Sequence, residues 1–409
     1  MAVGNVVFPE MQKISGIKLN AISAGIKKNN QLDVMLIELP ATVKVAGVFT
    51  QNAFCAAPVV VCKQHLSQQP RYLLVNSGNA NACTGEQGIQ DTLHCCEAVS
   101  ASSGSIHTSV QAQQVLPFST GVIGEPLPTQ KIIEAVPELF NGLEETNWLL
   151  AAQGIMTTDT QAKGASRCFE YQGETIIVNG IAKGAGMINP HMATMLGFIA
   201  TNAHLSQTLL ENLSFNSANQ SFNRITIDGD TSTNDSCILM ASGASSFFID
   251  DSEHELFALL ETAVFDVYRL LAQAIVRDGE GATKFVAIQV EGGATADECL
   301  QVAYAIAHSP LVKTALFASD PNWGRIVAAI GYAGVDQLDA DAIRLYLDDV
   351  LIVENGGRAA SYTEAAGQQV MDKEEILLRV CLGRGTATET IWTTDLSHEY
   401  VTINADYRS

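Results

Sequence analysis

A glycine-rich segment that also contains a proline, residues 183–202, leads into Thr194 at the start of an apolar run near the middle of the chain. If the bond between Ala193 and Thr194 is cut, Thr194 becomes an N-terminal residue with both a nucleophilic hydroxyl and an α-amine. The pKa of such an amine is about 7.7–8.0, so it can serve as the general base for its own hydroxyl at neutral pH. One residue would then supply two catalytic roles, and no Ser-His-Asp set is needed.

The elements that must position this residue are strands alternating with helices. Short runs, several of them β-branched and bounded by Gly, Asn or Asp, predict the strands. The expected strands are Val34–Leu39, Val59–Cys62, Tyr72–Val75, Thr175–Val178, Ile225–Ile227, Cys237–Met240, Phe285–Val290, Leu345–Val353 and Glu389–Thr393. Helical spacing predicts one helix over 252–277 and a second over 132–149, interrupted by Pro137. The mixture predicts an α+β fold with large sheets.

Charge is scarce and unevenly distributed. Charged residues make up 16% of the chain, against roughly 25% in ordinary soluble domains, which favours extensive burial and self-association. Residues 1–193 hold 11 Lys and Arg against 14 Asp and Glu, a net −3, and residues 194–409 hold 12 against 30, a net −18. This argues against nucleic acid or an anionic membrane as partner. An anionic substrate needs a local cation, and Lys183 is the nearest in sequence to Thr194.

The remaining composition excludes several classes of site. Nine cysteines without a C-x-x-C pair predict buried free thiols rather than a disulfide framework or a zinc site, and the scattered histidines give no metal-ligand pattern. We therefore assign no metal. The absence of an apolar run of about 18 residues and of a signal-like start favours the cytoplasm. The glycines of residues 184–186 and 278–284 do not complete a Rossmann or phosphate-loop pattern.

The segment Lys183-Gly-Ala-Gly-Met-Ile-Asn-Pro-His-Met-Ala-Thr-Met-Leu resembles the processing site of the bifunctional ornithine acetyltransferase/N-acetylglutamate synthase family of arginine biosynthesis. The resemblance covers essentially the whole chain. It is also carried by residues 76–85, 119–124, 154–160, 228–236, 278–285, 319–325 and 404–409. Ala185 and His191 depart from the residues common in the family, which leaves the cleavage rate open without affecting the nucleophile.

The resemblance implies a layered α/β sandwich of the self-processing, N-terminal-nucleophile-like type. The chain would cut itself between Ala193 and Thr194 into an α chain (1–193) and a β chain (194–409), usually paired as α2β2. Thr194 would take acetyl from N2-acetylornithine and pass it to glutamate through an acetyl-threonine ester. No cofactor is bound, and use of acetyl-CoA as a co-substrate is left open.

The resemblance also assigns roles to residues far apart in the sequence. Thr120 and Gly121 match the oxyanion hole. The substrate-contact positions are Thr157, Lys183, Thr194, Glu280, Asn404 and Ser409. Without the family match, Thr120 and Gly121 read equally well as a turn, Lys183 as a solvated lysine, Glu280 as a helix-end residue and the terminal residues as a frayed tail.

Two other interpretations compete with the acetyltransferase. An aminopeptidase or amidase of similar fold would use water in place of glutamate as the acyl acceptor. An unprocessed ligand-binding or scaffolding protein would keep the fold without the chemistry, and it would remain a single chain of 43.6 kDa.

Overall fold

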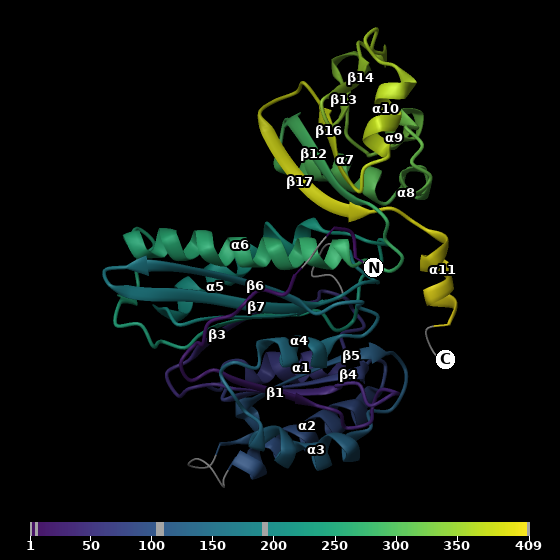
Figure 1. The fold of residues 1–409 in the computed structure, drawn as a ribbon. Coiled ribbons are helices and arrows are strands. Elements are labelled where there is room, and N and C mark those ends of the chain that lie inside the picture. The colour runs from purple at the N-terminus through teal and green to yellow at the C-terminus, as the bar shows by residue number, and fades with distance from the viewer. Residues whose placement is uncertain (1, 5–6, 104–109, 190–194, 407–409) are drawn as a thin grey trace.

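A computed structural model describes residues 2–4, 7–103, 110–189 and 195–406. Ala193, Thr194, His191 and Ser409 lie outside these residues. Figure 1 shows the described chain as a stack of sheets and helices, with the N-terminal elements in the lowest layers and the third sheet at the top. The α+β, layered fold predicted from the sequence is thus confirmed.

The first sheet is buried on both faces. Its order is β1 (Lys18–Ile22), β2 (Val34–Glu38), β4 (Tyr72–Asn79) and β5 (Val115–Val122), with β4 and β5 parallel. Successive side chains of a strand point to opposite faces, and along β2 Val34 and Leu36 pack beneath the sheet whereas Met35 and Ile37 pack above it. Continuous burial explains why these strands read as unbroken apolar runs.

Helices lie against both faces of the first sheet. Cys95, Cys96 and Val99 of α2 (Gly85–Ser103) pack below it with Ile132 and Val136 of α3 (Thr129–Asn141). Above it lie α4 (Trp148–Ile155) and α1 (Ala57–His65), which contribute to the core shared with the second sheet. The short helix η1 (Ala112–Gln114) leads into β5.

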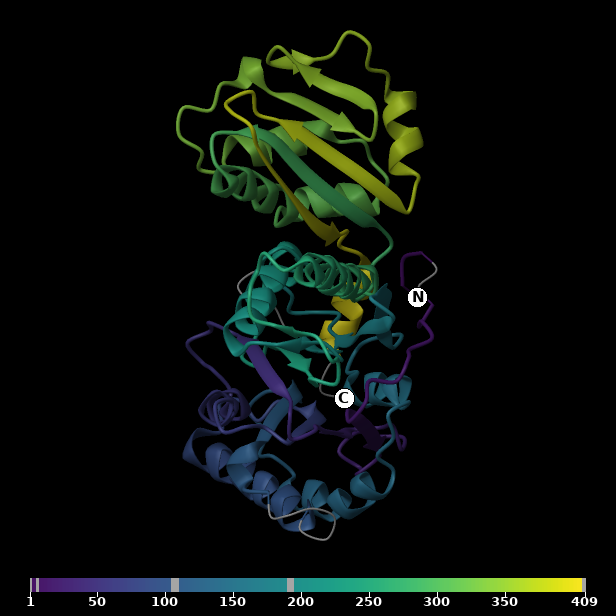
Figure 2. The same ribbon diagram turned by 90° about the vertical axis from the view of Figure 1, so that its left-hand side faces the viewer.

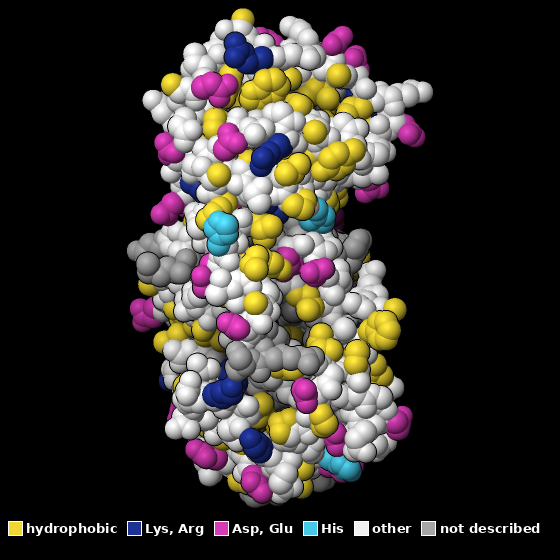
Figure 3. Space-filling view, turned by 90° about the vertical axis from the view of Figure 1, so that its right-hand side faces the viewer, with side chains coloured by type: hydrophobic (Ala, Val, Ile, Leu, Met, Phe, Trp, Pro, Cys, Tyr) yellow, Lys and Arg dark blue, Asp and Glu magenta, His cyan; other side chains and the backbone are white. Residues whose placement is uncertain are grey.

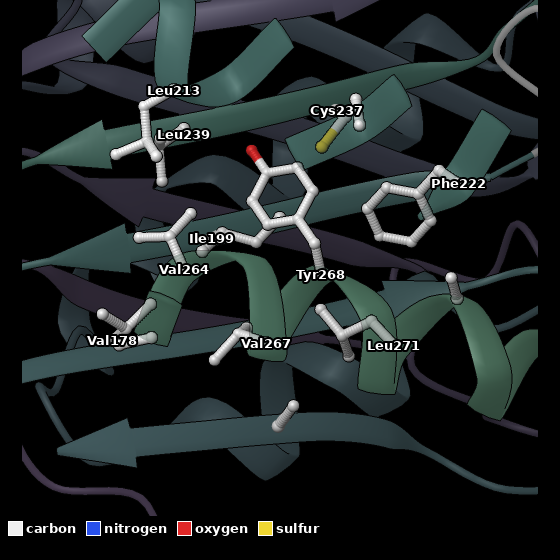
Figure 4. Close-up of a cluster of buried hydrophobic side chains, with 14 of the residues drawn as sticks. Val178, Ile199, Leu213, Phe222, Cys237, Leu239, Val264, Val267, Tyr268 and Leu271 are labelled. Carbon is white, nitrogen blue, oxygen red and sulfur yellow. The ribbon is translucent and has the colours of Figure 1, made fainter. Parts of the chain in front are cut away.

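The second sheet carries the strands on either side of the expected cleavage site. Its order is β3 (Lys44–Phe49), β10 (Ser236–Ala241), β8 (Leu196–Thr201), β7 (Glu174–Lys183) and β6 (Lys163–Tyr171). On its upper face α5 (Gln207–Asn219) and α6 (Glu255–Arg277) close a second core. Figure 4 shows Val264, Val267, Tyr268 and Leu271 of α6 turned toward Ile199 and Val178 of this sheet. Two small elements adjoin it, η2 (Phe222–Arg224) and the pair β9 (His204–Leu205) with β11 (Phe248–Ile249).

The third sheet has one face covered by helices. Its order is β15 (Gly357–Arg358), β14 (Val350–Glu354), β13 (Arg344–Leu347), β16 (Glu375–Cys381), β12 (Phe285–Gly293) and β17 (Ala387–Thr394). The helices are α7 (Ala296–Ala307), α8 (Pro310–Phe317), α9 (Trp323–Gly331) and α10 (Glu364–Met371), and η3 (Ala340–Ala342) precedes β13. After β17 the chain leaves this layer as α11 (His398–Ala405) and lies beside the second sheet (Figures 1 and 2).

Four sequence predictions of local structure were wrong in detail. The predicted strand Val59–Cys62 lies inside α1, where Pro58 in the first turn suits a helix start and burial outweighs the β-branched preference. Pro137 does not interrupt α3, because it lies on the exposed side of a helix that ends near Gly142. The run 345–353 is a hairpin of β13 and β14, and residue 225 forms an isolated bridge rather than a strand.

None of the helices described is both long enough and apolar enough to span a bilayer.

The packing of α6 predicts a position-dependent loss of stability. Leu271 is fully buried, whereas Leu259 on the same helix is 42% exposed. Leu271→Ala should lower the free energy of unfolding by about 2–5 kcal/mol, because it removes methyl groups from a closed core. Leu259→Ala should change it by less than about 0.5 kcal/mol. Urea unfolding followed by circular dichroism measures both, and equal losses would contradict the assigned face.

Candidate active site

A cleft of about 250 Å³ lies where β5, β7, the turn after α6 and α11 meet. It is lined by Ala80, Thr120, Gly121, Val122, Ile123, Thr157, Thr158, Lys183, Gly186, Met187, Ser232, Asn234, Glu280 and Asn404. Six residues proposed from the sequence therefore share one cavity, although they are spread over 285 positions of the chain. The remaining proposed residues, Ala193, Thr194 and Ser409, fall outside the described part of the chain.

Lys183 is the last residue of β7 and is almost completely buried. Its ammonium donates a hydrogen bond to Thr120 Oγ1 at 3.1 Å. Burial lowers the pKa of Lys183 below the ordinary lysine value, and Lys163 lowers it further, while Asp159, Asp235 and Glu280 oppose the shift. Lys183 pairs with Leu196 of β8, so this ammonium is anchored beside the strand that follows Thr194 in sequence.

Thr120 and Gly121 occupy an irregular end of the first sheet. The pairing of β4 with β5 shifts at Asn79, which is paired with both Thr120 and Val122. Gly121 has φ +135, and a Cβ there would lie 2.3 Å from the carbonyl carbon of Gly78, so no other residue fits without moving the backbone. Such irregularities re-aim the backbone at the ends of strands and are frequent beside active sites.

Residues 76–85 and 228–236, whose Gly and Asn clusters are typical of ordered turns, meet at this place. The Asn234 side-chain amide donates to the carbonyl of Ala80 at 2.6 Å and to that of Ser119 at 2.9 Å. The Asn76 amide closes the turn by donating to the carbonyl of Asn79 at 2.8 Å. These hydrogen bonds fix the backbone next to Thr120 and Gly121, the proposed oxyanion hole. The two asparagines thus have a structural role that the motif match did not reveal.

A buried ion network lies behind the cleft. The Lys163 ammonium is fully buried between Asp159, at 2.5 Å, and Asp278, at 2.6 Å. Asp159 also accepts the backbone N–H groups of Thr157, at 2.8 Å, and Gly184, at 2.7 Å. Burial alone would raise the pKa of Asp159, but the Lys163 and Lys183 ammonium groups together with the Gly184 N–H lower it below its ordinary value.

The sequence does not reveal this network, because Asp278 lies more than one hundred residues from Asp159 and Lys163 and nothing in the sequence links it to them. The only signal was that Asp159 and Asp278 each fall within a segment that carries the family resemblance. The network positions two proposed substrate-contact residues, since Thr157 is bonded directly to Asp159 and Lys183 precedes the bonded Gly184.

The C-terminal helix is docked on the cleft rather than frayed. The Asn404 amide donates to Glu280 Oε2 at 2.7 Å. The Tyr400 hydroxyl donates to Asp228 Oδ2 at 3.1 Å, and Asp228 in turn accepts the N–H groups of Met187, at 2.6 Å, and Ile188, at 2.9 Å. Asn404 is thus held at the cleft by a side-chain hydrogen bond. Helix α11 is therefore bonded directly to Glu280 and, through Asp228, to residues 187 and 188.

Glu280 lies close against residues 185 and 186 of the glycine-rich segment. The Glu280 N–H donates to the carbonyl of Ala185 at 2.8 Å. A Cβ on Gly186 would lie 2.5 Å from Glu280 Oε2, which explains the small residue in a segment that otherwise suggests a nucleotide loop. Lys284 of the other glycine cluster donates to the carbonyls of Met371 and Lys373 at 2.9 Å each, so its ammonium is used structurally.

The described residues hold no His, Cys, Asp or Glu group suited to a metal ion, and all nine cysteines are free. On the face drawn in Figure 3, the described Lys and Arg side chains stand apart from one another instead of forming a basic patch. The side chains that line the cleft offer hydroxyl, amide, ammonium and carboxylate groups.

The ion network predicts a large effect of removing its central charge. Lys163→Met should lower the free energy of unfolding by about 3–5 kcal/mol, because Asp159 and Asp278 would stay buried without a counter-charge. Lys373→Met serves as the control, since Lys373 pairs with Asp348 at 2.6 Å but is 54% exposed and should cost less than about 1 kcal/mol. Chemical denaturation of both variants measures the difference, and a small loss at Lys163 would contradict its central role.

Comparison with known proteins places the chain in a family. The ArgJ family model matches residues 18–409. The arginine biosynthesis bifunctional protein ArgJ of Pseudomonas fluorescens (strain Pf0-1) is 57% identical, and that of Pseudomonas syringae pv. tomato 56%, each over 100% of both chains. The crystal structure of the Bacillus halodurans protein of that name is 36% identical, with a TM-score of 0.49, and covers 51% of this chain and 97% of that chain. The family model and the two Pseudomonas relatives confirm the resemblance seen in the sequence: the chain belongs to the ArgJ family.

Proposed function

We propose that the chain is a glutamate N-acetyltransferase that cuts itself between Ala193 and Thr194 and then moves acetyl from N2-acetylornithine to glutamate. The observation that carries the proposal is the single cleft that gathers Thr120, Gly121 and Lys183 beside the start of β8. The relatives at more than half identity are named arginine biosynthesis bifunctional proteins, which supports the pathway and a second, acetyl-CoA-dependent acetylation of glutamate.

Self-cleavage comes first. The Thr194 hydroxyl attacks the carbonyl carbon of Ala193, the acyl group moves from nitrogen to oxygen, and water hydrolyses the resulting ester. The products are an α chain, 1–193, with a new carboxylate and a β chain, 194–409, with a free α-amine on Thr194. We place the two chains in an α2β2 assembly in the cytoplasm, as the family resemblance implies.

Acetyl transfer then follows a two-step path. The α-amine of Thr194 takes the hydroxyl proton, the oxygen attacks the acetyl carbonyl, and the proton passes to the amine of the departing ornithine. Glutamate enters, its amine attacks the acetyl-threonine ester, and acetylglutamate leaves with the threonine hydroxyl restored. No cofactor is required, because every proton and acyl group moves between the substrates and Thr194.

The contact between Lys183 and Thr120 supports an oxyanion role for Thr120. A threonine hydroxyl has one proton to donate and two lone pairs to accept. Since Thr120 Oγ1 accepts from the Lys183 ammonium, its own proton stays available for a developing oxyanion and is polarised by the neighbouring cation. The backbone N–H of Gly121 is the proposed second donor. A single donor of this kind is typically worth ~3–4 kcal/mol of transition-state stabilisation.

Charge at the cleft supports amino-acid substrates. In a chain with net charge −21, the substrate carboxylate needs the Lys183 ammonium as its partner. Glu280, held by Asn404 of α11, is the proposed acceptor for the ammonium of ornithine. Thr157, together with Ser409 at the terminus, completes the proposed contact set. The cleft thus offers one group of each sign, as a zwitterionic substrate requires.

Replacing the nucleophile tests self-cleavage. Wild type should run on a denaturing gel as two fragments of similar size, and Thr194→Ala as one chain of 43.6 kDa, because alanine has no hydroxyl to attack the Ala193 carbonyl. Thr194→Ser keeps the hydroxyl and should still be cut. N-terminal sequencing of the two fragments would show whether the β chain begins at residue 194.

The same variants test the transfer reaction. Ornithine release from N2-acetylornithine should depend on added glutamate in wild type and be absent in Thr194→Ala. Release that proceeds equally without glutamate would favour the hydrolase interpretation, and an active Thr194→Ala would remove Thr194 from its role.

Replacing Lys183 tests substrate binding. Lys183→Met keeps much of the buried chain but removes the ammonium, so KM for N2-acetylornithine, glutamate or both should rise by roughly 10-fold or more, the equivalent of one charged hydrogen bond of ~1.5–3 kcal/mol. Lys27→Met is the matched control at a lysine outside the cleft lining. Steady-state kinetics decide, and unchanged constants in Lys183→Met would demote Lys183 to a structural residue.

A further inference from the structure

Asp235 is a fully buried carboxyl that the mechanism above does not use. It lies just before β10, and its Oδ1 accepts the backbone N–H of Met195 at 3.0 Å. The next residue, Ser236, donates its N–H to the carbonyl of Met195 at 3.1 Å. Asp235 and Ser236 thus bond both backbone groups of the residue joined directly to Thr194.

The second oxygen of this carboxyl is the unusual feature. Asp235 Oδ2 is buried and has no hydrogen-bond partner among the described residues. Buried carboxyl oxygens are nearly always satisfied, because an unpaired one costs about 1–3 kcal/mol or more. Burial raises the pKa of Asp235 well above the ordinary value, and the Met195 N–H, the Lys183 ammonium and the Ser232 side chain together offset only part of this shift. Groups kept in such a state occur preferentially at functional sites.

The proposed self-cleavage needs a proton acceptor that the mechanism above does not supply, and Asp235 Oδ2 suits that role. In the uncut chain the nitrogen of Thr194 is an amide nitrogen and cannot accept the hydroxyl proton, so the first attack needs another base. Three other acids near the cleft already have partners. Glu280 accepts a hydrogen bond from the Asn404 amide. Asp159 binds Lys163 and two backbone N–H groups, and Asp228 binds Tyr400 and the N–H groups of residues 187 and 188.

We propose that Asp235 is the proton acceptor for the Thr194 hydroxyl during self-cleavage, an inference that rests on the proposed function. Its carboxylate takes the hydroxyl proton as the bond from Thr194 Oγ to the Ala193 carbonyl carbon forms. The carbon–nitrogen bond between the two residues then breaks, and the proton passes from Asp235 to the leaving nitrogen, which becomes the α-amine. Water hydrolyses the ester, and from then on the α-amine is the base for acetyl transfer.

The test compares Asp235→Asn with wild type. Asparagine has the same shape and still accepts the Met195 N–H, but it cannot take a proton. Full-length chain made by cell-free synthesis is sampled over time at pH values from 6 to 9, and the conversion of the 43.6 kDa chain to two fragments is followed on a denaturing gel. Asp235→Asn should cut at least ~100-fold more slowly, the usual contribution of a positioned base.

The pH profile separates proton transfer from mere positioning. A raised pKa means that Asp235 is protonated, and unable to accept, at low pH, so the wild-type cleavage rate should rise with pH through that pKa. In Asp235→Asn the residual rate should lose this rise. Asp235→Glu retains a carboxyl and should restore part of the rate, and Asp230→Asn, an exposed acid of the same segment, should cut like wild type. Circular dichroism checks that each variant is folded.

The outcomes distinguish the two levels of the proposal. A wild-type chain that stays uncut would overturn self-cleavage and the role of Asp235 with it. A wild-type chain that is cut, beside a folded Asp235→Asn variant with the same rate and pH profile, would overturn the role of Asp235 alone. If Asp235→Asn is unfolded, Asp235→Glu decides instead: a folded Asp235→Glu variant that cuts at the full wild-type rate with the wild-type pH profile would overturn the role, because moving the carboxyl by one methylene must change the rate if that carboxyl takes the proton.

Discussion

The geometry of the cleft depends on the ion pairs that the buried Lys163 ammonium forms with two aspartates. The ammonium neutralises Asp159 and Asp278, which come from segments more than one hundred residues apart. Without it, both carboxyl groups would stay buried with no ammonium group between them, which is strongly destabilising. Asp159 also binds the backbone at Thr157 and Gly184, and Asp278 binds the backbone N–H of Thr160 at 3.0 Å. One ion triad thus fixes three chain segments at once.

The proposed cleavage site lies, in sequence, between two neighbouring strands of one sheet and not between two domains. Strands β7 and β8, on either side of residue 194, are antiparallel neighbours in the second sheet. Strand β3, from the first part of the chain, pairs with β10 from the second. Cutting the chain at 193–194 would therefore leave the ladder hydrogen bonds and the shared core in place. The division into 1–193 and 194–409 is one of covalent connection, and the layers of the fold cross it.

The sequence marked residues of the cleft only where a motif carried them. Thr120, Lys183 and Glu280 were proposed because their segments resemble a family, and the fold brings them into one cleft. Lys163 and Asp235 were missed, since a lone lysine or aspartate carries no signal until burial and partners are known. Local errors had the same origin: α1 is helical despite its valines because packing outweighs intrinsic preference.

The excess of acidic residues in the second half of the chain has a structural explanation. Aspartates of this half act as acceptors for backbone N–H groups: Asp228 for residues 187 and 188, Asp235 for Met195, and Asp395 for residues 283 and 284. A carboxylate that accepts two N–H dipoles has part of its charge compensated locally, so it organises a turn without repelling an anionic substrate across the cavity. Lys183, whose partner in the cleft is the neutral Thr120 hydroxyl, then provides the positive charge that an amino-acid carboxylate would meet there.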